Sequence, residues 1–303
     1  MLKPYTKPAL TLEEQLAKLE MKGMLVADRK AALLKLQTIG YYRLSAYWFP
    51  YKNPLNGQLY DQVQFDHVIS LYEFDRSLRL LSLSAIERIE IAIRTKLTFH
   101  MGQKYGAYAH TDPDNFHPGF NHHSWLKKLA DETNRSSDQF IKHFQKTYCG
   151  FPDIPIWMLT EIMSLGSLSR MYKGLVNDRK AGTEDKKAIS LSFNVHHKQL
   201  EQWLHVLTYV RNVCAHHSRL WNRKLVIRTH KGKDPHWLPP ATPRSDRVFY
   251  VLLILKHLLD SIEEGNAWKQ QIEALMLSPV IRQAERTSMG MPEQWKTHPI
   301  WQK

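Results

Sequence analysis

Residues 211–223 read RNVCAHHSRLWNR and combine three arginines, two asparagines and two adjacent histidines without any acidic residue. The guanidinium of Arg211 can hold a phosphate and the negative charge that develops on it during transfer. His216 can exchange a proton near neutral pH, and Asn212 can orient either group. RNA carries its own nucleophile, the 2′-hydroxyl beside each phosphodiester, so this chemistry needs no metal ion. Arg211, Asn212 and His216 are therefore candidate catalytic residues for cleavage of RNA.

The helix that must position this group is expected from about Lys198 to Arg219, where apolar residues recur every three or four positions. At roughly 100° per residue, Arg211 falls among those apolar positions, so we expect it on the buried side of the helix. A buried guanidinium is costly unless it is paired. The alternative interpretation is a structural ion pair with Glu161, which lies on the apolar segment IWMLTEIMSLG.

The spacing of arginine and histidine does not identify the site by itself. Arg94 and His100 are separated by a similar number of residues, but Glu90 precedes Arg94 by four positions, and a salt bridge along a helix accounts for that arginine. His217, one position beyond His216, is an alternative or supporting histidine.

The charge around the candidate residues is one-sided. From residue 196 to residue 233 there are eight lysines or arginines, six histidines and one acidic residue. Such a patch fits a polyanion rather than an acidic small molecule. The residues expected to contact RNA phosphates are Arg219, Arg223, Lys224, Arg228, Lys231 and Lys233.

The whole chain agrees with this assignment. Its 303 residues carry 42 Lys or Arg against 29 Asp or Glu, a net charge of +13, which favours nucleic acid over an anionic membrane surface as the partner. The first residues lack the apolar core of a signal peptide, and no run reaches the ~18 apolar residues of a membrane span. The two cysteines, Cys149 and Cys214, form no disulfide framework. We expect a cytoplasmic protein that does not contact the membrane.

Motifs for other chemistry are missing from the sequence. There is no GxxxxGK or GxGxxG segment, so no nucleotide cofactor is expected. Histidine pairs occur at 122–123, 196–197 and 216–217, but none has HExxH spacing, so metal-dependent hydrolysis is the weaker enzymatic alternative and no metal site is predicted.

Helical periodicity dominates the sequence and predicts an all-α fold, a single multi-helix bundle with aromatic-rich loops. Thr11 and Glu14 predict a capping box at the start of a first helix, and a long apolar stripe predicts a central helix over about 65–101. A break is expected near Gly166, and the tail should be irregular and tethered by its tryptophans. We divide the chain into an N-terminal helical part (1–60), a helical core (61–280) and a C-terminal tail (281–303).

Three segments in this order, TIGYYRLSAYWFPY, PIWMLTEIMSLGSLSRMY and RNVCAHHSRLWNR, resemble the Abi-like family of bacterial abortive-infection proteins of the AbiD/AbiF type. The resemblance extends over nearly the whole chain. It implies the HEPN class of helical ribonuclease, whose signature is an arginine, a polar residue, and a histidine four to six positions after the arginine. Arg211, Asn212 and His216 match that signature.

The resemblance also implies a toxin-like function in phage defence, restrained by a small non-coding RNA as in a toxin–antitoxin pair. It further implies a homodimer, because HEPN sites commonly combine two copies of the motif. The sequence leaves one non-enzymatic alternative open, an RNA-binding protein whose Arg–His pair is structural.

Overall fold

The computed structural model describes residues 4–60, 62–178, 183–226, 234–242 and 244–303. These residues form fourteen α-helices and a single two-stranded hairpin, so the prediction of an all-α fold is confirmed. The helices are α1 (Leu12–Glu20), α2 (Arg29–Ile39), α3 (Tyr41–Trp48), α4 (Phe65–Tyr105), α5 (His122–Arg135), α6 (Gln139–Thr147), α7 (Ile156–Ile162), α8 (Leu165–Gly174), α9 (Asp185–Leu191), α10 (His197–Ala215), α11 (Val248–Asp260), α12 (Trp268–Met276), α13 (Gln283–Ser288) and α14 (Pro299–Gln302). The antiparallel hairpin pairs β1 (Asn177–Asp178) with β2 (Thr183–Glu184).

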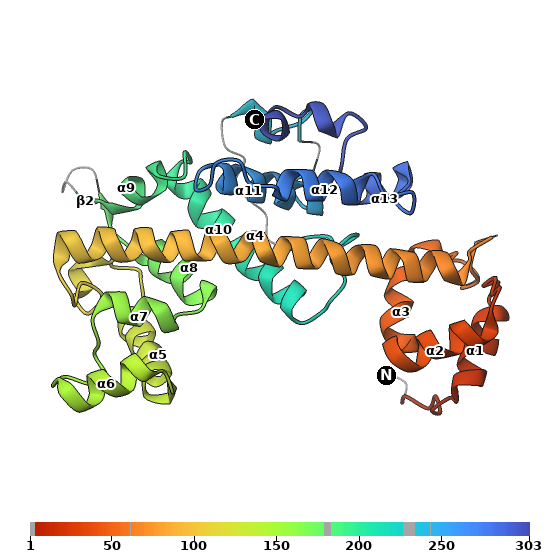
Figure 1. The fold of residues 1–303 in the computed structure, drawn as a ribbon, viewed down its shortest axis with the longest axis horizontal. Helices are drawn as coiled ribbons and strands as arrows, with labels where there is room; N and C mark the ends of the chain where they lie inside the picture. The colour runs from red at the N-terminus through yellow and green to blue at the C-terminus, as the bar shows by residue number, and fades with distance from the viewer. Residues whose placement is uncertain (1–3, 61, 179–182, 227–233, 243) are drawn as a thin grey trace.

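The central feature is α4, a continuous helix of 41 residues that is about 60 Å long at 1.5 Å per residue (Figure 1). It begins at the predicted position and runs one turn further than expected, to a C-cap at Gly106, which has a positive φ of 85°. Its apolar stripe is buried along the whole length, from Val68 to Met101. All other groups of helices are arranged along this one.

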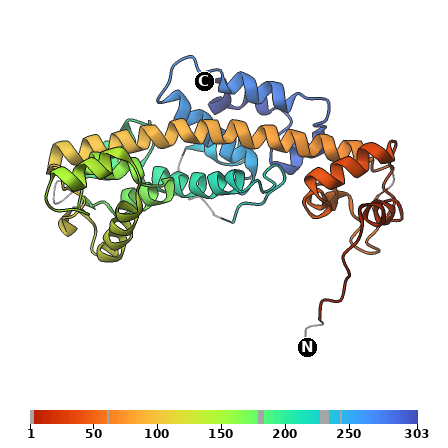
Figure 2. The ribbon, with the colours of Figure 1, turned by 60° about the horizontal axis from the view of Figure 1, so that its bottom comes forward.

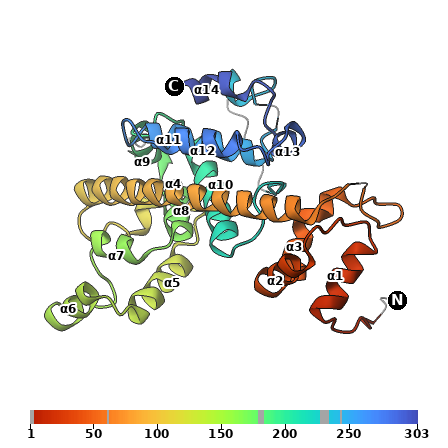
Figure 3. The ribbon, with the colours of Figure 1, turned by 45° about the vertical axis from the view of Figure 1, so that its right-hand side comes forward.

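Helices α1–α3 lie beside the first turns of α4, as Figures 1 and 3 show. The predicted capping box is present: the Thr11 side chain accepts from the amide of Glu14, and the Glu14 carboxylate accepts from the amide of Thr11 at 2.7 Å. Helix α3 packs on α4 through buried Tyr47 and Leu44. The aromatic segment of the sequence therefore connects the N-terminal helices to the central one.

Helices α5–α9 lie toward the other end of α4. The expected break between α7 and α8 occurs at Met163 and Ser164 rather than at Gly166, because the Ser164 side chain caps α8 by accepting from the amide of Ser167 at 3.2 Å. Gly166 lies inside the first turn of α8, where a Cβ would stand 3.4 Å from the Thr208 methyl group of α10. Its small size allows α8 and α10 to pack closely.

The C-terminal helices α11–α14 cover the remaining side of the core. Helix α11 is buried on nearly all sides, from Val248 to Leu259. The tail is tethered by tryptophans as predicted: Trp295 and Trp301 are buried, and the Trp301 indole donates to Glu273 at 2.8 Å. Helices α9, α12, α13 and the short α14 were not predicted from the sequence. Within the described ranges, no helix combines the length and apolar character needed to cross a membrane.

Candidate functional site

Helix α10 carries the candidate residues, and it lies beside the middle of α4 (Figures 1 and 2). Its buried sector changes along the length: Leu200 and Leu204, which face the same way as Arg211, are buried in the first half, whereas Val210, Val213 and Cys214, on other sides, are buried in the second half. Two helices that cross touch over only part of their length, so the sector that is buried rotates from one neighbour to the next. Arg211 is consequently exposed, and the expectation that it lies on the buried side is wrong.

The alternative pairing of Arg211 with Glu161 is also not formed. The side chain of Glu161 is 58% exposed, and its carboxylate lies 3.6 Å from the guanidinium of Arg94. Arg94 in turn pairs with Glu90 at 3.1 Å, which confirms the salt bridge expected along α4. His100 lies next to the Asp185 carboxylate at 2.7 Å. Arg94 and His100 thus have separate partners.

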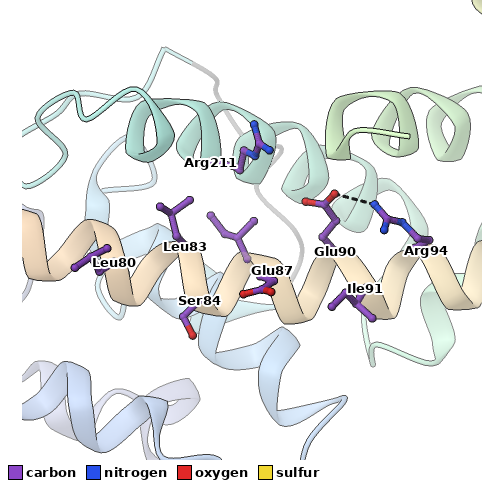
Figure 4. Close-up of a pocket in the computed structure, with 9 residues that line it drawn as sticks. Leu80, Leu83, Ser84, Glu87, Glu90, Ile91, Arg94 and Arg211 are labelled. Atoms are coloured by element: carbon purple, nitrogen blue, oxygen red, sulfur yellow. Dashed lines mark hydrogen bonds and ion pairs between the residues drawn. The ribbon is translucent and has the colours of Figure 1, made fainter. Parts of the chain in front are cut away.

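Glu90, Arg94 and Arg211 line a hollow of about 570 Å³ between α4 and α10 (Figure 4). Burial raises the pKa of Glu90, although Arg94 and Arg211 oppose that shift. Arg211 forms no ion pair with any residue that the structure describes; its guanidinium donates only a long hydrogen bond, 3.4 Å, to the Asn212 side chain. Arg94 therefore neutralises Glu90, and Arg211, which shares the hollow with Glu87 and Glu90, remains open to an external anion.

The turn that follows α10 is built around His217. The amide of His217 donates to Cys214 and that of Ser218 donates to Val213, the two hydrogen bonds of a Schellman motif. This turn ends the helix at Ala215, four residues before the expected end. His217 occupies the left-handed position of the motif with φ of +54°, where glycine is usual. His217 thus carries an exposed side chain at a position where glycine would be less strained.

This strain predicts that two substitutions of His217 differ in their effect on stability. His217→Gly should raise the free energy of unfolding by about 0.5 to 1 kcal/mol, because glycine adopts positive φ without a steric penalty. His217→Ala removes the same imidazole but keeps the strain, so it should give no such gain in a urea titration. If the glycine variant is not more stable than the alanine variant, the left-handed turn is not the source of strain.

Asp75 of α4 fixes the chain beyond that turn. This fully buried carboxylate accepts from the amides of Leu220 and Trp221, at 3.0 and 2.7 Å, and from the hydroxyl of Tyr47 at 2.7 Å. It also pairs with Arg79, one turn further along α4. Burial and the neighbouring carboxylate raise the pKa of Tyr47, so its hydroxyl stays protonated as a donor. The network holds α3, α4 and the end of the motif in one arrangement.

Arg43 of α3 adds a contact that the sequence analysis missed. Its guanidinium donates to the backbone carbonyl of His217 at 2.6 Å, although the two residues are 174 positions apart. The side chain of Arg43 is otherwise exposed, so it adds positive charge beside the histidines. Only its place in the motif YYRLS could have drawn attention to it.

The remaining site predictions divide into three groups. Arg219 is partly buried, which lowers its pKa, and it donates to the Ala46 carbonyl, while Arg223 donates to the Tyr209 hydroxyl at 3.1 Å. Lys224 is exposed. The other three predicted RNA contacts, Arg228, Lys231 and Lys233, lie outside the described residues.

Two further observations limit the chemistry at the motif. Burial raises the pKa of the Cys214 thiol to about 12, so this cysteine is protonated and is not a nucleophile. The side chain of His216, in contrast, is exposed at the C-cap of α10 and forms no hydrogen bond to a described residue. In the same ranges, no three His, Cys, Asp or Glu side chains lie close enough to hold a metal ion together.

Comparison with known proteins gives one match. Neither curated proteins nor solved structures gave any match to the chain, but a family model described as "Abi-like protein" matches residues 34–222. The match covers more than half of the chain and includes α3, the Asp75 network and the whole Arg211–His216 motif. The chain therefore belongs to the Abi-like protein family, which suggests a function in phage defence.

Proposed function

We propose that this protein is an RNA-binding, metal-independent endoribonuclease of the HEPN class, acting in abortive infection. The observation that carries the proposal is that Arg211, in the last turns of α10, and His216, at its C-cap, are exposed and have no ion pair with a described residue, while Asp75 anchors the segment that follows. An arginine with a purely structural role would be paired inside the fold, as Arg79 and Arg94 are. The non-enzymatic alternative, RNA binding without cleavage, shares the same charge but does not require this geometry.

The proposed reaction is an intramolecular transfer. His216 takes the proton from a 2′-hydroxyl, whose oxygen attacks the adjacent phosphorus while the bond to the 5′-oxygen breaks. Arg211 stabilises the negative charge on the pentacoordinate phosphate, and Asn212 orients the guanidinium or the phosphate. A 2′,3′-cyclic phosphate and a 5′-hydroxyl are the products, and the 5′-oxygen must receive a proton as it leaves.

The second proton transfer leads to a proposal about assembly. Each chain supplies one exposed Arg211 and one His216, so a homodimer with its two-fold axis near residues 211–217 would place two such pairs at one phosphate. Two guanidinium groups brought together repel each other, and a bound phosphate would relieve that repulsion. We therefore include a homodimer in the proposed function.

A restraining partner completes the proposal. A ribonuclease without sequence preference would damage its own cell, and a structured small non-coding RNA matches the basic surface around the motif. Lys224 is the exposed contact for such an RNA among the described residues, because Arg219 and Arg223 are engaged within the fold. We place the protein in the cytoplasm, where it would encounter such RNAs.

The chemistry can be tested on a generic RNA labelled at one end. We expect the wild type to cleave it equally well in magnesium and in EDTA, and the products to carry a cyclic phosphate that acid opens. Products with a 5′-phosphate, or activity that disappears in EDTA, would contradict the proposed mechanism. Binding without any cleavage would favour the non-enzymatic alternative.

A further inference from the structure

A separate groove lies on the N-terminal helices, away from the Arg211–His216 motif. It has a volume of about 970 Å³ and is lined by the residues before α1, by α1, α2 and α3, and by the segment that follows α3. Its lining includes four lysines and no acidic residue. We call it the lysine–aromatic groove, and its lysines are Lys7, Lys18, Lys22 and Lys52.

The acidic residues of this region are engaged elsewhere. Glu13 and Glu20 both pair with Arg29 of α2, and Glu14 serves the capping box of α1. None of the four lysines forms an ion pair in the described part of the chain. Burial and the charges of its three lysine neighbours lower the pKa of Lys22, which shows how closely these ammonium groups gather. A bound anion would relieve their mutual repulsion.

Aromatic rings line the same groove and are open to solvent. Tyr5 is 84% exposed, Tyr42 is 90% exposed and Phe49 is 67% exposed, whereas most aromatic rings of this size lie in a core. Tyr41 also lines the groove and makes an edge-on contact with Trp48 at 5.1 Å between ring centroids. Exposed rings among unpaired lysines are the combination that proteins use to hold single-stranded nucleic acid, whose bases stack while its phosphates are neutralised.

We propose that the lysine–aromatic groove binds single-stranded RNA. A hollow lined by rings and ammonium groups suits unpaired bases and their phosphates, whereas a membrane surface would be met by protruding apolar side chains. The choice of RNA as the ligand rests on the proposed function, but binding in this groove does not require that the protein cleaves RNA.

Helix α3 connects the groove to the turn that follows α10. Tyr42 lines the groove, while the following residue, Arg43, donates to the carbonyl of His217. Helix α3 is only eight residues long, about 12 Å. A strand held in the groove therefore leads toward the Arg211–His216 motif, and the groove would increase the local concentration of substrate or of a restraining RNA.

The test measures binding separately from cleavage. The full chain carrying His216→Ala is titrated, in EDTA, into a fluorescein-labelled oligouridylate, and anisotropy is followed over a range of salt concentrations. In this background, Lys18→Glu/Lys52→Glu should weaken binding about tenfold or more and make the plot of log affinity against log salt less steep, by ~0.7 per lost phosphate contact. Both lysines are exposed, so the fold should tolerate the change.

Matched controls make the same substitutions, lysine to glutamate or tyrosine to alanine, at residues outside the groove. Lys30→Glu/Lys127→Glu alters two exposed lysines outside the groove and should weaken binding much less. Tyr42→Ala should weaken binding at least about fivefold through lost stacking, whereas Tyr108→Ala, outside the groove, should not.

The outcomes separate this proposal from the proposed function. If the groove and control lysine variants lose affinity equally, the groove is not an RNA site, even where the wild type cleaves RNA. If the groove variants bind RNA normally but lose binding to vesicles rich in phosphatidylserine, the groove contacts membrane and the proposal is overturned. RNA binding that depends on the groove, together with no cleavage by the wild-type protein, supports the groove and contradicts the ribonuclease.

Discussion

His216→Ala should lower the rate of RNA cleavage by about 10²- to 10⁴-fold, because it removes the group that takes the 2′-hydroxyl proton. Arg211→Ala should cause a loss of about 10²- to 10³-fold, since it removes the charge that stabilises the pentacoordinate phosphate. Arg211→Lys should recover only part of that loss, because an ammonium cannot form the planar fork. Initial rates on a labelled RNA in EDTA provide the measurement.

The matched control for these variants is His205→Ala. His205 is an exposed histidine on the same helix, outside the motif. Its removal should leave the cleavage rate within about twofold of wild type. Equal losses for His205→Ala and His216→Ala would show that the effect is not specific to the motif.

Mixing the two inactive proteins tests the composite site. In a homodimer whose motifs share one phosphate, an Arg211→Ala chain paired with a His216→Ala chain still offers one arginine and one histidine. We expect such a mixture to regain measurable activity that neither variant shows alone. A mixture that stays inactive, or an active species that light scattering shows to be a monomer, would rule out a shared site.

Asp75→Asn should have the largest effect on stability, about 3 to 5 kcal/mol less free energy of unfolding, because it leaves Arg79 as a buried charge without its partner. It also weakens the acceptor of two backbone amides beyond the motif. The midpoint of urea unfolding measures the loss. Glu73→Gln, an exposed change two residues away on α4, should stay within about 0.5 kcal/mol.

Asp75→Asn should also reduce cleavage more than its folded fraction explains, because the segment that follows the turn at His217 would no longer be anchored. Normal cleavage by the folded fraction would mean that the Asp75 network stabilises the protein but does not position the motif.

The local features of the fold could be predicted from the sequence. The Thr11–Glu14 capping box, the stripe of α4 and the anchoring tryptophans of the tail each depend on residues only a few positions apart. Helix α9 was missed because its apolar residues are too few to define a period, whereas Trp268, Ile272 and Met276 of α12 do have helical spacing and could have been recognised. Their helical state depends on packing against α10 and α4.

The surroundings of the candidate site could not be predicted in the same way. Asp75 resembles a surface acid that pairs with Arg79 one turn away, and nothing local reveals that it accepts from amides 145 and 146 residues distant. Arg211 is exposed because the neighbouring helices no longer cover its side of α10 at that point. Helical periodicity predicts the side of the helix on which a residue lies, but not where along the helix that side is covered. The sequence thus predicts candidate residues for a site but not the contacts that surround them.

The length of α4 has a consequence for how the chain can be divided. A protein built from separate modules can be cut between them, and each fragment keeps its own core. Here a single rod contributes to the interior of the N-terminal helices, of the region that bears the motif and of α5–α9. A cut at residue 60 would separate α1–α3 from α4, and a cut at residue 106 would separate α4 from the helices that follow it. Either cut would expose apolar residues of α4 to water. Genetic truncation should yield insoluble fragments rather than working parts, and fusions are best attached at the chain ends.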